Sequence, residues 1–337
     1  MRPERGWQAR FVHVFASGPR LTYAIAPPNQ ATPLERRRAI ARAQSERVAS
    51  LPIDALLVYD VQDEALRNQQ PRPFPFMPKV DPLTYALDEL DTGALPCVVY
   101  RAVAEQSEQS LRRWLERLEA RGGRVVLVGA PSRGTAASLS LPQAYSACRR
   151  HAPGLPVGGV VIPERHRASG TEDARIWAKV QQGCSFFVSQ TVWCKSSTQQ
   201  LLRDLRARAD AEGGSVPPIL LTFSPCGSRQ TLEFLEWLGV YVPPALKQDL
   251  LSATDMLARS VELAVQAYAE LRAFAAARGL SVGCNVESVS SRAAEVEASV
   301  ELVCRIARLD ASPGRAARAS GAARDGSVRP TQARLRD

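Results

Sequence analysis

Polar side chains that could do chemistry recur directly after short apolar segments of the chain. A carboxyl group that is buried near other carboxylates can keep its proton at neutral pH and serve as a general acid. A side-chain amide offers a hydrogen-bond donor and an acceptor to the same ligand. Together these polar side chains could carry out acid–base chemistry on a bound small molecule if the fold brings them together. They are Asp60, Gln62, Asp63, Glu64, Tyr100, Arg101, Glu164, Arg165, His166, Ser189, Gln190, Thr222, Ser224, Arg229, Asn285, Glu287 and Ser288.

Other common kinds of active site have no counterpart in the sequence. No group of three histidines, or of histidine with aspartate, has the spacing of a metal site. A GxSxG nucleophile motif and a phosphate-binding P-loop are also absent. The seven cysteines are an odd number, widely separated and without a CxxC pair, which predicts reduced thiols. Each polar candidate alone also has a structural alternative, because an Asp or Asn after a strand often caps the next helix.

The segment 183–193 (GCSFFVSQTVW) shows how the chain could position such a side chain. Its apolar run is too short for an ordinary helix and is rich in residues that suit a strand. The flanking segments 172–182 and 196–211 carry apolar residues on one face and charged residues on the other, which predicts helices. Gly183 is expected to end the first of them. Gln190 would then lie where a parallel strand gives way to a loop, the edge at which such sheets bind ligands.

The same alternation of strand and helix runs through the chain. Eight βα units predict an α/β fold of the (β/α)8 barrel class, whose active site is formed by loops at the carboxyl ends of the strands. A doubly wound open sheet is the second choice, but its glycine fingerprint is missing from the first βα turn, 26–29. A proline-rich loop over 69–82 is long enough to be a lid or an insertion. The expected strands are 21–26, 54–60, 96–100, 124–128, 157–162, 183–193, 218–223 and 281–287. The expected helices are 33–50, 105–120, 142–150, 172–182, 196–211, 230–238, 245–278 and 292–309.

Composition limits the remaining classes of function. With 337 residues, 45% of them hydrophobic, the chain can bury a full core. No apolar run approaches about 18 residues and the basic start lacks the apolar region of a signal peptide, so we expect a cytoplasmic protein without a membrane span. Six arginines and two acids place +4 of the net charge of +9 in 311–337. We expect an N-terminal extension over 1–20, a barrel over 21–309, a disordered Arg-rich tail over 310–337, and no specific nucleic-acid partner.

Several segments, in the same order along the chain, resemble the methylenetetrahydrofolate reductase family. They are 21–28 (LTYAIAPP), similar to its first strand and double proline; 163–166 (PERH), similar to its PExH signature; 179–190 (KVQQGCSFFVSQ); and the strand exit 218–225. The resemblance covers about 21–309. It implies a (β/α)8 barrel that passes a hydride from NAD(P)H, normally through bound FAD, to 5,10-methylenetetrahydrofolate, giving 5-methyltetrahydrofolate.

The resemblance also assigns roles to individual residues. Gln190 matches the amide that hydrogen-bonds the pterin, and His166 and Lys179 match positions that contact the flavin. Ser132, in the exit of the fourth strand, is a further cofactor-binding candidate. Gly129-Ala130 replace an Arg-Gly pair of the family. Because Pro131 also replaces its acidic residue beside the flavin, we expect FAD to bind weakly or not at all and the nicotinamide to react directly.

The family's catalytic glutamate on the first strand is replaced by Ala24, which cannot transfer a proton. By their positions at strand ends, Asp60, Glu164 and Glu287 are the candidates for a replacement acid. Glu287 ranks first because 283–289 (GCNVESV) is an unusually polar end for an inner strand.

A second set of residues is expected to contact the substrate. These are Gln190, Arg229, Tyr100 and Asn285; Arg229 stands where the family has a phenylalanine. Basic residues near the barrel mouth, Arg101, Arg165 and Arg229, could hold the glutamate tail of a reduced folate.

Three functions remain open, in order of preference. The first is an oxidoreductase that transfers a hydride between NAD(P)H and a one-carbon folate. The second is a folate-binding barrel with another one-carbon reaction, and the third is a non-catalytic regulatory relative. The sequence leaves the oligomeric state open, a homo-oligomer included.

Overall fold

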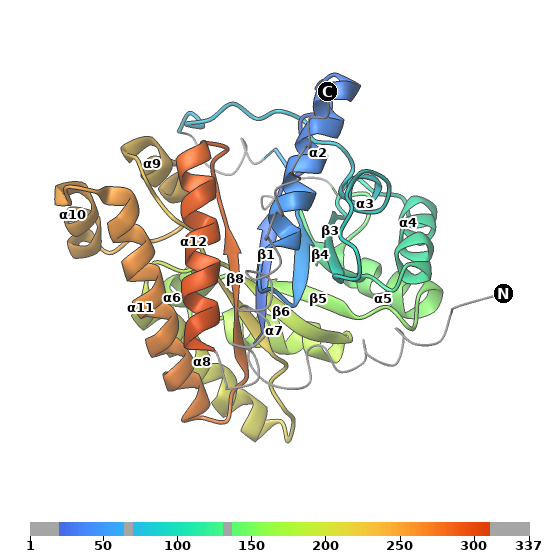
Figure 1. Cartoon of the computed structure of the whole chain (residues 1–337). Helices are drawn as coiled ribbons and strands as arrows, with labels where there is room; N and C mark the ends of the chain where they lie inside the picture. The colour runs from blue at the N-terminus through green and yellow to red at the C-terminus, as the bar shows by residue number, and fades with distance from the viewer. Residues whose placement is uncertain (1–19, 64–69, 131–136, 311–337) are drawn as a thin grey trace, which may run out of the picture.

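Eight short, apolar segments of four to eight residues form the strands of a closed barrel. The computed structural model describes residues 20–63, 70–130 and 137–310. All eight strands are parallel and each pairs with its neighbours in the sequence, β8 closing on β1. The predicted (β/α)8 barrel is therefore confirmed (Figure 1). The strands are β1 (Leu21–Ile25), β2 (Ala55–Val58), β3 (Cys97–Ala102), β4 (Arg124–Val128), β5 (Val157–Val161), β6 (Cys184–Thr191), β7 (Ile219–Phe223) and β8 (Val282–Glu287).

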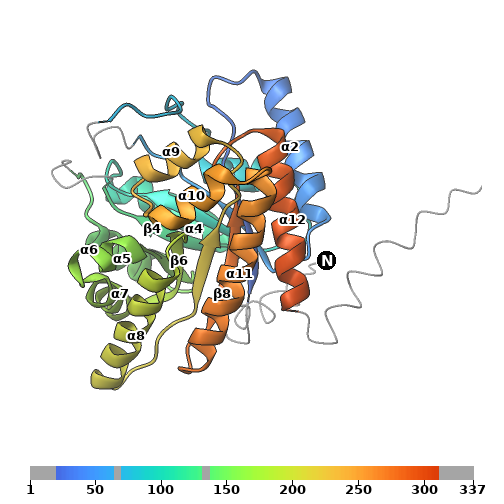
Figure 2. The same cartoon turned by 90° about the vertical axis from the view of Figure 1, so that its left-hand side faces the viewer.

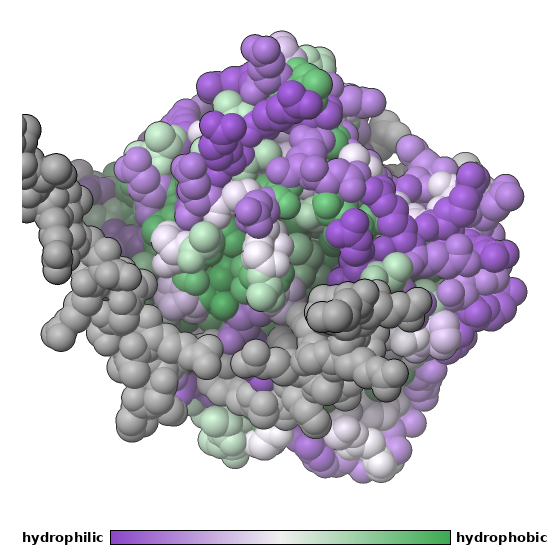
Figure 3. Space-filling view, turned by 45° about the vertical axis from the view of Figure 1, so that its right-hand side comes forward, coloured by the Kyte–Doolittle hydropathy of each residue, from purple (hydrophilic) through white to green (hydrophobic). Residues whose placement is uncertain are grey.

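Helices surround the barrel, as the views in Figures 1 and 2 show. The face in Figure 3 is hydrophilic in its upper and right-hand parts, and hydrophobic residues gather around a hollow in its middle. The helices are α2 (Leu34–Ala49), α3 (Pro82–Thr84), the π-helix η2 (Tyr85–Glu89), α4 (Glu108–Ala120), α5 (Leu141–His151), α6 (Pro163–Ser169), α7 (Glu172–Gln181), α8 (Lys195–Ala211), α9 (Arg229–Trp237), α10 (Pro244–Ser252), α11 (Met256–Ala276) and α12 (Ala293–Leu309).

Alternate side chains of each strand fill the interior of the barrel, as the period of two along a strand requires. Gly158 of β5 leaves room for the ring of Phe186, since an added Cβ would lie 2.5 Å from a ring atom. The remaining side chains of the strands pack outward against the helices in a larger apolar cluster. The interior cluster is formed by Ala24, Ala55, Leu57, Val98, Tyr100, Val126, Phe186, Val188 and Leu220.

Several predicted elements differ from the observed ones. The segment 163–166 was expected to be a loop but begins α6, because a proline suits the first turn of a helix, where its missing N–H is not needed. The single helical region over 245–278 is two helices, α10 and α11. The second begins anew because Asp255 accepts a hydrogen bond from the N–H of Ala258 and caps it. Gly183 follows α7 with φ +100°, as predicted for a residue that ends a helix.

The predicted domain boundaries need small corrections. The carbonyl of Arg20 accepts a hydrogen bond from the N–H of Cys284 in β8, so this residue belongs to the barrel and not to the extension. Asp310 is buried and accepts a hydrogen bond from Tyr268 at 2.9 Å, so the barrel includes it as well. The rest of the predicted extension (1–19) and tail (311–337), with Glu64 and Ser132, lies outside the described residues.

Two expected absences can be examined in the part of the chain that the structure describes. None of its helices is long and apolar enough to cross a membrane. Its His, Cys, Asp and Glu side chains form no group that could hold a metal ion. All seven cysteines are free in the structure, and the predicted reduced state of the thiols stays a prediction.

The proline-rich segment that follows β2 lies at the end of the barrel where the strands exit. Its residues 70–81, which we call the strap, run along the top of the molecule between α9 and the α2–α3 side (Figures 1 and 2). The predicted loop ends where Asp81 caps α3 by accepting from the N–H of Thr84. The helical turns of α3 and η2 that follow were not predicted.

Candidate functional site

The carboxyl ends of all eight strands share one rim, because the barrel is closed and every strand pair is parallel. Gln190 lies near the end of β6 and Glu287 at the end of β8. The ends of these two strands therefore lie on the same rim, and the prediction that the two side chains line one basin there stays a prediction. Tyr100 belongs to the interior cluster on β3, and Tyr59, directly after β2, packs against the same cluster.

Glu287 forms the acidic centre of this rim together with two tyrosines. Burial raises the pKa of Glu287 to about 7, and a hydrogen bond from Tyr59 offsets part of the rise. The rings of Tyr59 and Tyr100 meet edge to face, with centroids 4.7 Å apart. Burial, followed by the charge of Glu287, raises the pKa of both tyrosines. Glu287 can thus exist in both protonation states near neutral pH beside hydroxyl groups that keep their protons.

Tyr59 is a site residue that the sequence analysis missed. It follows Leu57 by two positions, and Leu57 points into the barrel, so the alternation of the strand also directs Tyr59 inward. The polar residues after β2 drew attention to Asp60 instead. Asp60 accepts a hydrogen bond from the N–H of Ala102 at 2.8 Å and so ties the end of β2 to β3. Burial raises its pKa.

Asn285 holds Tyr59 in place from inside the barrel. Its side chain is fully buried, and its amide nitrogen donates to the Tyr59 hydroxyl at 2.9 Å and to Thr222 Oγ1 at 3.1 Å. Its Oδ1 accepts from Thr22 Oγ1 at 2.9 Å. Both amide N–H groups are thus engaged within the protein. In this arrangement Asn285 orients Tyr59. A contact between Asn285 and the substrate stays a prediction.

Gln190 has one end of its amide engaged and the other end free. Its Nε2 donates to the carbonyl of Leu238, which follows α9, at 2.9 Å. Its Oε1 is buried and has no hydrogen-bond partner among the described residues. An unpaired buried acceptor is unfavourable. The amide is therefore held by its nitrogen with its acceptor unsatisfied, and its contact with a pterin stays a prediction.

Glu164 is the second carboxyl with a strongly shifted pKa. It lies in the first turn of α6, and burial raises its pKa to about 7 even though the N–H of Tyr241 donates to it. Its Oε2 is buried and unpaired within the described part of the chain. Of the three predicted acids, Glu164 and Glu287 thus share the protonation behaviour of a general acid.

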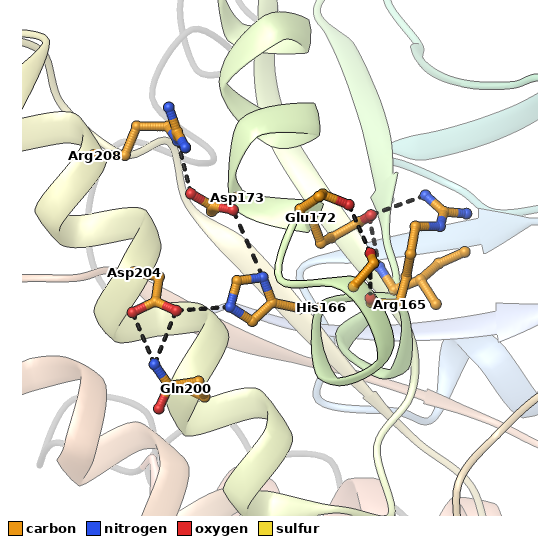
Figure 4. A network of polar contacts seen from close by, with 10 residues as sticks. Arg165, His166, Glu172, Asp173, Gln200, Asp204 and Arg208 are labelled. Atoms are coloured by element: carbon orange, nitrogen blue, oxygen red, sulfur yellow. Dashed lines mark hydrogen bonds and ion pairs between the residues drawn. The ribbon is translucent and has the colours of Figure 1, made fainter.

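His166, one of the two predicted flavin contacts, is engaged in a polar network between α6, α7 and α8 (Figure 4). His166 Nε2 lies 2.8 Å from Asp204 Oδ2, and His166 Nδ1 lies 3.7 Å from Asp173 Oδ1. Asp173 in turn accepts from Arg208 at 2.7 Å. Lys179 donates to the carbonyl of Val160 at 2.5 Å, and burial lowers its pKa.

These contacts weigh against a flavin at the predicted positions, and weak or absent binding of FAD stays a prediction. His166 Nε2 and Lys179 Nζ already have partners in the protein, and Gly129-Ala130 offer no side-chain cation to a diphosphate. A pocket beside His166 is lined by both Asp204 and Arg167, so its lining carries charges of both signs.

Of the three arginines predicted at the mouth of the barrel, two are paired with side chains of the protein and one is exposed. Arg101 donates to Asp81 at 2.8 Å and to Gln106 at 2.6 Å. Arg165 pairs with Glu172 at 2.9 Å. Both guanidinium groups are therefore committed to side chains of the protein. Arg229, the first residue of α9, is exposed, and its contact with substrate stays a prediction.

One solved structure matches the chain over nearly its whole length. It is an uncharacterized protein from Clostridium thermocellum that binds two copies of 5-methyl-5,6,7,8-tetrahydrofolic acid. The two sequences are 32% identical, and the match covers 88% of this chain and 98% of that chain, with a TM-score of 0.76. This chain belongs to the family of that clostridial protein.

The other comparisons give no further evidence on the family of this chain. Dihydropteroate synthases from Xanthomonas albilineans and Thermus thermophilus match at 17% and 18% identity, over 88% and 86% of this chain and 95% and 93% of theirs. Their TM-scores of 0.43 and 0.40 are too low to support an argument. No family model matches the chain, and no curated protein does. The similarity to methylenetetrahydrofolate reductases thus stays a resemblance.

Proposed function

We propose that the chain binds a reduced folate at the rim of the barrel and transfers a hydride between NAD(P)H and a one-carbon folate without FAD. The reaction would convert 5,10-methylenetetrahydrofolate to 5-methyltetrahydrofolate. The observation that carries the proposal is the position of the Glu287 carboxyl at the end of β8, where it accepts a hydrogen bond from Tyr59 and where burial raises its pKa to about 7. Support for the ligand comes from the clostridial relative, which binds 5-methyltetrahydrofolate.

The residues at the rim have the properties that this chemistry needs. The five-membered ring of methylenetetrahydrofolate opens when N10 takes a proton, which breaks the bond from N10 to the methylene carbon and leaves an iminium at N5. A hydride from the nicotinamide then reduces that carbon to a methyl group. In our proposal Glu287 donates the proton and is left as a carboxylate. The free Oε1 of Gln190 accepts a hydrogen bond from an N–H of the pterin.

A second function is favoured by one specific observation. Ala24 stands where the methylenetetrahydrofolate reductase family has its acid, so this chain could bind methylated folate for another one-carbon reaction or in a regulatory role. Binding of 5-methyltetrahydrofolate by the clostridial relative is compatible with either function. Oxidation of NAD(P)H that depends on methylenetetrahydrofolate separates the two, because only the first function requires it.

A thermal-shift panel with reduced folates, NADH, NADPH and FAD tests the proposal. A ligand that binds only the folded state stabilises it, by about 2.7 kcal/mol at a concentration of 100 times Kd. We expect 5-methyltetrahydrofolate and 5,10-methylenetetrahydrofolate to raise the melting temperature. NADH or NADPH should then be consumed in the presence of the methylene form. No shift with any reduced folate would reject the proposed ligand.

The purified protein is expected to contain no stoichiometric flavin. The reason is that the side chains at the predicted flavin positions, His166 and Lys179, are engaged within the protein. Absorption spectroscopy of protein purified without added cofactor, followed by titration with FAD, measures this directly. A flavin band at near one equivalent per chain would contradict the prediction.

A further inference from the structure

The strap (residues 70–81) is fastened at both of its ends. At one end the carbonyl of Gln70 accepts from Trp237 Nε1 at 2.9 Å, and Phe74 packs edge to face on Phe234 of α9 with centroids 5.2 Å apart. At the other end the N–H of Val80 donates to the carbonyl of Pro28, in the loop after β1, at 3.0 Å. The strap therefore bridges from α9, which follows β7, to the exit of β1. Because β8 lies between β7 and β1 in the barrel, this is the stretch of rim to which Glu287 belongs.

Arg72 of the strap has no acidic partner among the residues that the structure describes. Its guanidinium lies 5.4 Å from the ring centroids of Phe76 and Phe234 and 5.1 Å from that of Trp237. These rings orient the side chain. Its Nε and Nη1 are buried and have no hydrogen-bond partner among the described residues, and no carboxylate there forms an ion pair with it. A hydrogen-bond acceptor on a ligand would pair with these N–H groups and remove the energetic cost of leaving them buried and unpaired.

Lys79, also on the strap, adds a second positive charge. Its Nζ donates to Asn29 Oδ1 at 2.7 Å, which is a neutral partner. Burial, followed by the charge of Arg72, lowers the pKa of Lys79, so the two cations are close enough to repel each other. Two cations that face no carboxylate within the described chain attract an anion.

We propose that Arg72 and Lys79 bind the carboxylate of the glutamate tail of the folate that occupies the rim. This inference rests on the proposed function, which places the pterin by Glu287 and Gln190. The tail is the anionic end of the ligand and must leave the rim toward its edge, where the strap lies. A planar guanidinium pairs with a carboxylate through two N–H groups, and an ammonium adds a point charge. Arg101 and Arg165, predicted for this role, are instead paired with Asp81 and Glu172.

The test compares two ligands that differ only in the tail. Isothermal titration calorimetry measures the Kd of 5-methyltetrahydrofolate and of 5-methyltetrahydropteroate in the form of its uncharged primary amide, which keeps the benzamide but lacks the glutamate carboxylates. In the wild-type protein we expect the pteroate to bind about tenfold more weakly, since a charge-assisted hydrogen bond contributes at least that factor. Arg72→Gln should raise the Kd of the folate toward that of the pteroate and leave the Kd of the pteroate unchanged. Arg292→Gln, which removes an exposed arginine that contacts Gln230 of α9, should change neither.

A second pair of variants separates charge from support of the strap. Lys79→Gln should weaken only the folate, whereas Asn29→Ala removes the same hydrogen bond but keeps the charge and should leave the folate Kd unchanged. Equal wild-type affinity for both ligands, or equal losses for both in Arg72→Gln and Lys79→Gln, would overturn the inference while the proposed function stands. If Arg72→Gln and Lys79→Gln weaken the binding of NADPH and not of the folate, the two cations bind a phosphate, and the inference is likewise overturned. If the wild-type protein binds neither ligand, the proposed function itself is rejected, and the inference with it.

Discussion

Glu287→Gln is expected to lower turnover about 10²- to 10⁴-fold while the Kd of 5-methyltetrahydrofolate changes little. Glutamine has the size of the acid and can accept the hydrogen bond from Tyr59, but it cannot donate a proton to N10. Stopped-flow oxidation of NADPH with methylenetetrahydrofolate, together with calorimetric binding, measures both effects. Glu164→Gln is the matched control, because its carboxyl also has a pKa raised to about 7. Unchanged turnover in Glu287→Gln with a loss in Glu164→Gln would move the role of acid to Glu164.

The pH dependence of the same reaction has a definite sign. The active form of a general acid is the protonated one, and the pKa of Glu287 is raised to about 7. The value of kcat/KM should therefore be high below pH 7 and decline as the pH rises through about 7. In Glu287→Gln this alkaline decline should be absent from the residual rate. A wild-type rate that rises with pH across neutrality would contradict a role of Glu287 as the acid.

Asn285→Ala is expected to destabilise the protein by about 3 kcal/mol. The substitution removes the donor to the Tyr59 and Thr222 hydroxyls and the nearer of two acceptors of the Thr22 hydroxyl, which keeps the carbonyl of Cys284. Each of these three lost hydrogen bonds costs about 0.5–1.5 kcal/mol. Urea unfolding followed by circular dichroism measures the change. Tyr59 also loses its orientation, so the turnover of the folded fraction should fall.

Thr222→Val provides the matched control for that change. It removes one partner of Asn285 and keeps the shape of the side chain and the bond from Asn285 to Tyr59. We expect a smaller loss of stability and nearly normal turnover. If Thr222→Val lowers turnover as much as Asn285→Ala does, the effect does not pass through Tyr59.

The fold could be predicted because its signals are local. Each strand is a short apolar run, and each outer helix shows one apolar face, so the count and order of the elements follow from neighbouring residues. Once eight parallel strands close into a barrel, their ends share a rim, and Gln190 and Glu287 could be placed there without coordinates. Gly183 could likewise be predicted, because only a local conformation with positive φ is involved.

Contacts across long stretches of chain were decided by the tertiary structure alone. Asn285 reaches Tyr59 over 226 positions and Trp237 reaches Gln70 over 167, and no local period encodes such pairs. The engagement of His166 by Asp204, and of Arg101 by Asp81, likewise depends on which helix or loop packs against which strand. The sequence by itself determined the barrel and the side chains at its rim, because periodicity is a property of neighbours. Which of those side chains stay free to meet a ligand depended on partners that only the packed fold brings within hydrogen-bonding distance.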